Sequence, residues 1–122
     1  MFFSCCRRSV SGWVCSPDGL VKDHMLDVIQ GHINAIYYGE DPYSKVFCGA
    51  KHQNTSIQVL AVVIDKVDGR GDASRRVARF ARGVHDRFGV GSADCGSGAV
   101  VVVSVDDRQV VSWCCIIRCL PA

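Results

Sequence analysis

The apolar residues that follow Leu20 recur at steps of three and four positions, which is the spacing of one side of an α-helix. Four residues define this side: Met25, Ile29, Ile33 and Ile36. The turn-forming sequence "SPDG" (residues 16–19) precedes it, and Gly39 lies where a helix of about five turns would end. The pattern therefore predicts a first helix between Leu20 and Gly39.

The same spacing returns after Asp72. The apolar positions of this second pattern are Ala73, Val77, Phe80, Ala81, Val84 and Phe88. Asp72 is a residue type that caps helix N-termini, and Gly89 or Gly91 is expected to end the helix in a left-handed conformation. We therefore predict a second helix over residues 73–88.

Three segments carry runs of β-branched and apolar residues without helical spacing. The runs "SIQVLAVVID" (56–65) and "GAVVVVSV" (98–105) are too continuously apolar for one wet face, so both predict strands buried on two faces. The turn "DD" separates the second run from "RQVVSW" (108–113), which predicts a hairpin. Residues 39–56 are interpreted as a long polar connection.

The predicted order of helix, strand, helix, strand, strand is typical of an α/β fold with a small mixed sheet of about three to four strands covered by helices. The strand–helix–strand unit is compatible with a parallel crossover. We expect residues 13–113 to form the domain, with an N-terminal flank at 1–12 and a divergent tail at 114–122. Because no helix is predicted after the third strand, we expect the domain to be incomplete at its C-terminal end.

Charge and apolar content restrict the possible partners. The formal net charge is +2, which is too small to indicate a nucleic-acid surface. The longest apolar stretch, Ala99 to Val105, is far shorter than the roughly 18 residues of a membrane span. The N-terminal sequence "MFFSCCRRSVSGWVC" does not have the order of regions that marks a secretion signal.

Eight cysteines are a high number for a chain of 122 residues, and such a number is typical of an extracellular protein. No two of them have C-x-x-C spacing, which disfavours a zinc site. Cys15, Cys48 and Cys95 lie inside the patterned region. A disulfide among these three is our preferred interpretation, and buried free thiols are the alternative.

The glycine-rich loop "GVGSADCGSG" (89–98) has two interpretations. A phosphate-binding glycine loop follows a strand and opens a helix, whose N-terminal amides hold the phosphate. This loop follows a predicted helix and precedes a strand, which is the reverse order. We therefore interpret the glycines as turn residues, and we expect no cofactor.

Several motifs, taken in order, resemble the TPM domain. They are "SPDGLV", the strand "IQVLAVVID", the helix "VARFARGVHDRFGVG" and the segment "DCGSGAVVVVSVDDRQV". The opening "WVCSPDG" and the cysteines at 15 and 95 look most like the branch called modulator of levamisole receptor. The resemblance runs from about Trp13 to Val111, and the family's usual D-N-G pattern departs here to Gly96-Ser97-Gly98.

This resemblance implies an extracellular auxiliary subunit of a nicotinic acetylcholine receptor complex at the plasma membrane. Such a subunit raises the agonist-gated response by protein–protein contact and catalyses nothing. Receptor subunits are then the implied partners, and membrane association is implied through the receptor or through a segment absent from this chain.

An enzyme is the alternative that the same resemblance leaves open, because some TPM domains are described as phosphatases that use a divalent metal ion. The candidate ligands are Asp65, Asp68 and Asp94. Asp65 ends one predicted strand and Asp94 precedes another, so they are expected to share an edge of the sheet. Metal-assisted chemistry needs such carboxylates to converge on one point.

Two surface features remain. Arg75, Arg79 and Arg82 lie on the polar side of the second helix, and they are either a surface for an acidic partner or a solvated helix face. The sequence Asn54-Thr55-Ser56 is an N-glycosylation sequon in a polar segment, which makes Asn54 the candidate glycosylation site.

Overall fold

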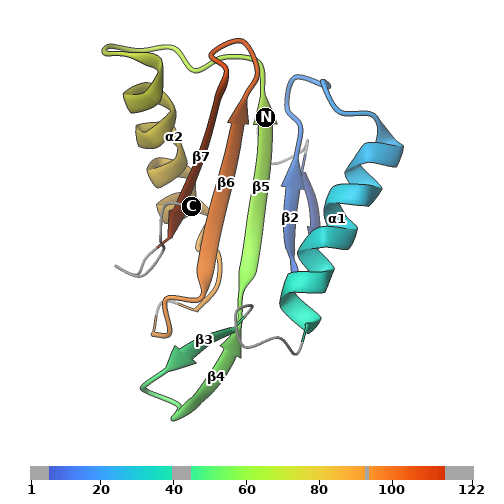
Figure 1. Ribbon diagram of the computed structural model, residues 1–122, viewed down its shortest axis with the longest axis vertical. Helices are drawn as coiled ribbons and strands as arrows, with labels where there is room; N and C mark the ends of the chain where they lie inside the picture. The colour runs from blue at the N-terminus through green and yellow to red at the C-terminus, as the bar shows by residue number, and fades with distance from the viewer. Residues whose placement is uncertain (1–5, 40–44, 93, 115–122) are drawn as a thin grey trace.

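The computed structural model describes residues 6–39, 45–92 and 94–114, which form a mixed α/β fold (Figure 1). The elements follow in the order β1 (Cys6–Ser9), β2 (Gly12–Cys15), α1 (Asp23–Tyr38), β3 (Lys45–Cys48), β4 (Gln53–Ser56), β5 (Gln58–Ile64), α2 (Ala73–Phe88), β6 (Gly98–Ser104) and β7 (Gln109–Cys114). Both predicted helices and all three predicted strands are present, so the predicted fold class is confirmed.

The main sheet has five strands in the order β1-β2-β5-β6-β7. The central pairs β2–β5 and β5–β6 are parallel, and the outer pairs β1–β2 and β6–β7 are antiparallel. The predicted parallel crossover through α2 and the predicted β6–β7 hairpin are therefore both confirmed. The predicted strand count was too low because β1 and β2 have four residues each, which is too short for a clear alternation.

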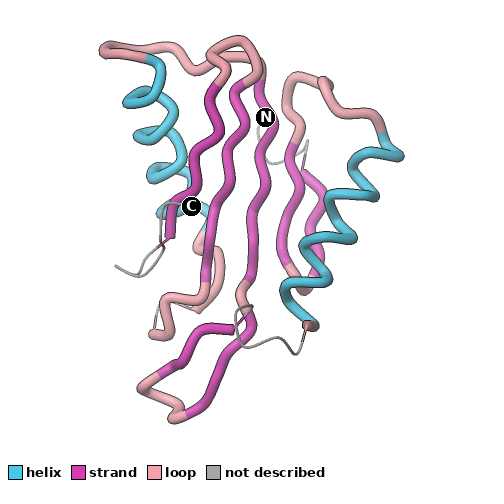
Figure 2. Tube along the Cα trace, in the orientation of Figure 1, coloured by secondary structure: helices cyan, strands magenta, loops and turns pink. Residues whose placement is uncertain are grey.

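A second sheet lies in the segment that was predicted to be a polar connection. Strands β3 and β4 pair antiparallel there, from Lys45 opposite Ser56 to Cys48 opposite Gln53 (Figure 2). The sequence prediction was wrong because "QNTS" in β4 has no apolar residue. A two-stranded sheet without an apolar face is only marginally stable by itself, so contacts with the main body must hold it.

The two helices cover opposite faces of the main sheet (Figure 1). Helix α1 packs on β2 and β5, and its Ile33 is buried with Val14 and Val59. Helix α2 packs on β6 and β7 on the other face, where Val77 belongs to the larger core cluster. The continuous apolar runs of β5 and β6 are explained by this arrangement, because their alternate residues face different helices.

The apolar side predicted for α1 is only partly buried. Ile33 is 2% exposed, whereas Met25 and Ile36 are 45% and 36% exposed. Helix α1 covers the β2–β5 half of its sheet face, and no described helix covers β6 and β7 on that face (Figure 1). Val110 of β7, 69% exposed, lies on this uncovered part.

Both ends of α2 have the predicted local structure. The Asp72 side chain accepts a hydrogen bond of 2.9 Å from the backbone N–H of Arg75, as an N-cap does. Gly89 adopts the left-handed conformation with φ 61° and ψ 44°, and its N–H donates to the His85 carbonyl. These caps fix the helix at residues 73–88.

Two disulfides join described residues. Cys48 pairs with Cys95, as expected for the three central cysteines. Cys15 pairs instead with Cys6, its direct neighbour across the β1–β2 ladder. Sequence reasoning did not find this partner because β1 was not predicted and Cys6 was assigned to the N-terminal flank.

Candidate functional site

The arginines of α2 divide into one inward residue and three outward residues. The Arg76 side chain is 17% exposed and reaches across to Asp107 in the β6–β7 turn, with 2.8 Å between Nη2 and Oδ1. Arg75, Arg79 and Arg82 are exposed on α2. We call these three residues the arginine stripe.

Asp107 is the centre of the inward contacts. Its Oδ2 accepts hydrogen bonds from the backbone N–H of Val67 at 2.9 Å and from the Ser104 hydroxyl at 2.7 Å. The pKa of Asp107 is lowered below its ordinary value. The hydrogen bond from Val67 is the largest cause, the bond from Ser104 is the next, and Arg76 contributes less. Arg76 is therefore a structural residue, and it does not belong to the arginine stripe.

The arginine stripe is held in place by contacts that leave its charges at the surface. The Arg82 guanidinium carbon lies 5.5 Å from the ring centroid of Trp113 on β7, which is within cation–π range. Arg79 donates to the backbone carbonyl of Arg70. Arg75 is 78% exposed and lies 3.9 Å from the Asp72 carboxylate. The stripe can therefore offer three positive charges to an acidic partner.

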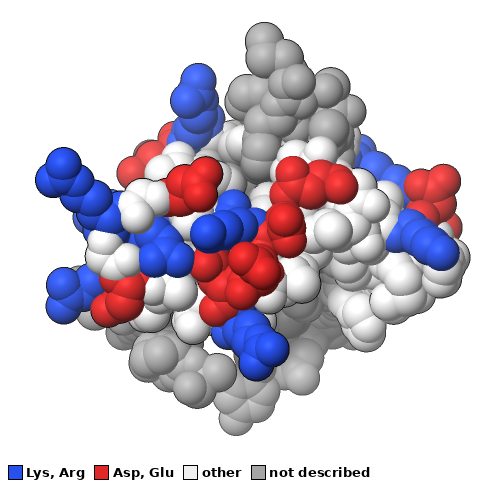
Figure 3. Space-filling model, turned by 90° about the horizontal axis from the view of Figure 1, so that it is seen from above, with Lys and Arg blue, Asp and Glu red and all other residues white. Residues whose placement is uncertain are grey.

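Acidic residues gather at the end of the molecule where β5 and β6 finish, with lysines and arginines around them (Figure 3). Here the Asp18 carboxylate accepts a hydrogen bond of 2.8 Å from the N–H of Asp65, and the N–H of Asp106 donates to the Asp65 carbonyl. No group of three or more potential metal ligands occurs among the described residues.

The expectation that Asp65 and Asp94 share an edge of the sheet is wrong. Strands β5 and β6 are parallel, with Gln58 opposite Gly98 and Ile64 opposite Ser104. Asp65 follows the last of these pairs and Asp94 precedes the first, so about 20 Å of strand separates them. Asp65 and Asp68 lie in the β5–α2 connection, and Asp94 lies near the opposite end of the sheet.

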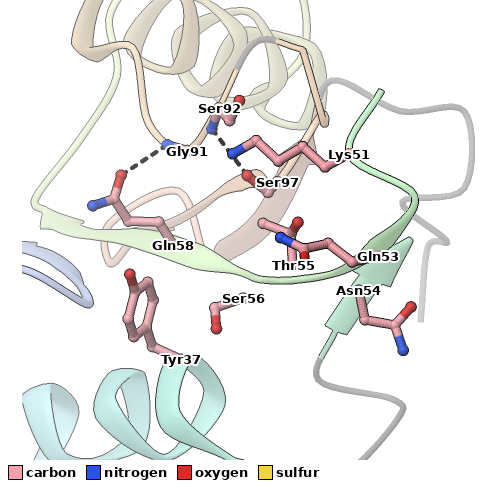
Figure 4. Close-up of a pocket in the computed structure, with 10 residues that line it drawn as sticks. All are labelled: Tyr37, Lys51, Gln53, Asn54, Thr55, Ser56, Gln58, Gly91, Ser92 and Ser97. Carbon is pink, nitrogen blue, oxygen red and sulfur yellow. Dashed lines mark hydrogen bonds between the residues drawn. The ribbon is translucent and has the colours of Figure 1, made fainter. Parts of the chain in front are cut away.

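That opposite end contains a polar pocket of about 430 Å³. Its lining residues come from α1, the β3–β4 sheet, β5 and the glycine-rich loop: Tyr37, Lys51, Gln53, Asn54, Thr55, Ser56, Gln58, Gly91, Ser92 and Ser97 (Figure 4). The N–H of Gly91 donates to Gln58 Oε1 at 2.8 Å, and the N–H of Ser92 donates to Ser97 Oγ at 2.9 Å.

The backbone hydrogen bonds of the glycine-rich loop decide between its two interpretations, a phosphate site and a turn. The amides of Cys95, Gly96 and Ser97 all donate to the Ser92 carbonyl, so the loop's N–H groups point into the loop itself. A phosphate cradle needs such groups free to donate. At Gly98, an added Cβ would lie 1.8 Å from the Val90 carbonyl oxygen, so this glycine permits a close chain approach. The glycines thus form a turn.

The family model described as modulator of levamisole receptor-1 matches residues 2–108. The chain belongs to this family. The resemblance found in the motifs is therefore confirmed. No curated protein and no solved structure matches the chain.

Within this modulator of levamisole receptor domain, the family match covers β1 to β6 and the whole arginine stripe. It also includes both disulfides described above. None of the described helices is long and apolar enough to cross a membrane.

Asn54, the glycosylation candidate, lies exposed on β4 and beside the pocket, and its amide points away from the other pocket residues (Figure 4). Its cross-strand neighbour Phe47 is 61% exposed, which sequence reasoning did not predict. The signal for this exposure was weak, because it depends on the alternation of β3, where Cys48 faces inward and Phe47 therefore faces outward.

Proposed function

We propose that this chain acts as the extracellular modulatory domain of a nicotinic acetylcholine receptor complex and raises the agonist-gated response by protein–protein contact. The observation that carries the proposal is the match to the modulator of levamisole receptor family over residues 2–108. The proposed role needs no catalytic group.

The cysteine pairing supports an extracellular location for this domain. Cys6–Cys15 and Cys48–Cys95 are both bonded. Such disulfides form and persist in the secretory pathway and outside the cell, and they are rare in the reducing cytosol. Placement at the plasma membrane follows from the proposed contact with a receptor.

We assign the receptor contact to the arginine stripe of Arg75, Arg79 and Arg82. These side chains come from one rigid helix whose opposite side is packed on β6 and β7. Three neighbouring positive charges would favour an acidic patch on a receptor subunit and would speed association. If the patch is more accessible in the agonist-bound receptor, binding shifts the gating equilibrium toward that state.

The test compares agonist-evoked currents from nicotinic receptors in cells that do or do not display this chain at their surface. We expect larger currents with the unaltered chain. The triple variant Arg75→Gln, Arg79→Gln and Arg82→Gln should lose most of this increase, because the attraction to the acidic patch is removed. Raising the ionic strength from low to physiological should weaken binding of the unaltered chain.

The matched control removes three positive charges elsewhere. Lys22, Lys51 and Lys66 are exposed and lie outside α2, so their replacement by Gln changes the net charge equally. This variant should keep the current increase. Equal loss in both variants would contradict the assignment to α2, and no increase with a displayed, folded chain would contradict the proposed function.

A further inference from the structure

Phe47 and Asn54 form a cross-strand pair on the outer face of the β3–β4 sheet. They lie directly opposite each other in the antiparallel ladder, so their side chains project from the same face. The neighbouring pair, Cys48 and Gln53, projects from the other face, where Cys48 is 1% exposed and bonded to Cys95. The disulfide therefore fixes which face of the sheet is outward.

The outer face combines an acceptor for an N-glycan with an uncovered aromatic ring. Asn54 begins the sequon Asn54-Thr55-Ser56 and is exposed, with its amide directed away from the pocket (Figure 4). Phe47 exposes 61% of its surface in a sheet that is otherwise polar on this side.

We propose that Asn54 carries an N-linked glycan whose first N-acetylglucosamine packs on the Phe47 ring and stabilises the β3–β4 sheet. This inference rests on the extracellular location in the proposed function, since the modification is made in the secretory pathway. It goes beyond that function because it concerns a face that does not include α2.

The covalent step uses a lipid pyrophosphate-linked oligosaccharide as donor, supplied by the secretory pathway's oligosaccharide transferase. The Asn54 side-chain nitrogen attacks the anomeric carbon of the first sugar. A C–N bond forms, the bond between that carbon and the pyrophosphate oxygen breaks, and the lipid pyrophosphate leaves. The nitrogen releases one proton and keeps the other, so no oxidant or reductant is required.

Contact between the sugar and the ring has a physical cause. The axial C–H groups of a pyranose carry partial positive charge, and the face of an aromatic ring carries partial negative charge. Side chains directly opposite in an antiparallel pair have Cβ atoms roughly 5 Å apart, so a sugar on Asn54 starts within reach of the ring. The contact would bury apolar surface of Phe47 at the least supported sheet of the domain.

The experiment uses the full chain secreted from cells that make high-mannose glycans. Intact mass before and after enzymatic removal of N-glycans reports occupancy, and Asn54→Gln should abolish the glycan. Ser56→Thr changes the same strand but keeps the sequon, so it should remain glycosylated. It therefore shows that loss of the glycan in Asn54→Gln comes from loss of the acceptor and not from any change in this strand.

Trimming the glycan to a single N-acetylglucosamine then isolates the proposed contact. We expect amide hydrogen exchange in residues 45–48 and 53–56 to be slowed by roughly 1.5- to 5-fold relative to Asn54→Gln, the range for one favourable cross-strand pair. When Phe47→Ala is added both to the chain that carries one N-acetylglucosamine and to Asn54→Gln, the sugar should no longer slow exchange.

An unglycosylated secreted chain would overturn the inference, as would equal slowing of exchange with and without the Phe47 ring. Neither result would affect the current increase assigned to the arginine stripe, so failure of this inference is distinguishable from failure of the proposed function.

Discussion

Arg76 on α2 and Asp107 in the β6–β7 turn form an ion pair 2.8 Å long across 31 positions of the sequence. Their side chains are 17% and 5% exposed. Arg76 also donates to the carbonyls of Val67 and Gly71, so it joins the start of the helix to the connection before it. The pair thereby fastens the β5–α2 connection to the β6–β7 turn.

Replacing Asp107 with Asn should lower the melting temperature at neutral pH, because Arg76 would lose its charged partner in a largely buried place. Asp106→Asn is the matched control. Asp106 is exposed, so its replacement should change the melting temperature little. Thermal unfolding followed by circular dichroism measures both, and equal effects of the two variants would contradict the structural role of the pair.

Because of Asp107, we expect the free energy of unfolding to depend on pH in the acid range. The pKa of Asp107 is lower in the folded chain than its ordinary value of 3.8, which applies in the unfolded chain. The folded state therefore binds fewer protons in this range. The stabilisation that Asp107 provides is complete above about pH 5 and is lost as the pH falls through the folded pKa. Chemical unfolding between pH 7 and pH 2 should show that the free energy of unfolding falls less with acid in Asp107→Asn than in the unaltered chain.

The two disulfides should contribute unequally to stability. In the chain-entropy model, closing the 47-residue separation of Cys48–Cys95 contributes about 4 kcal/mol, and the 9-residue separation of Cys6–Cys15 about 2.5 kcal/mol. Replacing Cys48 and Cys95 together with Ala should therefore lower the free energy of unfolding more than replacing the other pair. Denaturant unfolding measures the order, and the reverse order would mean that folded-state contacts outweigh chain entropy.

Two glycines of the α2–β6 unit should respond oppositely to Ala. At Gly98 the added Cβ would overlap the Val90 carbonyl oxygen, so we expect a loss of about 3 kcal/mol, the upper end of the overpacking range. Gly83 lies exposed within α2 with open space around it, so Gly83→Ala should gain about 0.5–1 kcal/mol. Denaturant unfolding checks both signs, and a stable Gly98→Ala variant would contradict the close approach.

Long segments with one clear period were predictable from the sequence. Helix α2 has its apolar stripe, the Asp72 cap and the Gly89 end, all of which are local signals, and the structure places them as expected. The strands β5 and β6 were predictable because seven consecutive strand residues between two covering layers must be largely apolar.

The remaining features depend on contacts that no local pattern contains. Strand β1 is defined by its pairing with β2, and Cys6 finds Cys15 only through that pairing. The ion pair of Arg76 depends on Asp107, which is 31 positions away in the sequence, so no local pattern indicates it. The separation of Asp65 and Asp94 is different, because the predicted parallel crossover already implies that the end of β5 and the start of β6 lie at opposite ends of the sheet.

Gln58 provides a final test, because its side chain joins two loops at the pocket end. Its Oε1 accepts from the N–H of Gly91 at 2.8 Å, and its Nε2 donates to the Val10 carbonyl at 3.0 Å. Gln58→Leu removes both bonds and should cost about 1–3 kcal/mol, because the partly buried N–H of Gly91 loses its partner. Gln58→Glu keeps only an acceptor for Gly91.

Amide hydrogen exchange at Gly91 distinguishes the two Gln58 variants. Exchange should accelerate in Gln58→Leu and stay close to that of the unaltered chain in Gln58→Glu, because the carboxylate still accepts from this N–H. Both variants should unfold more easily, since both lose the donor to Val10. Unchanged protection of Gly91 in Gln58→Leu would mean that the glycine-rich loop keeps its shape through its own bonds to Ser92, without support from β5.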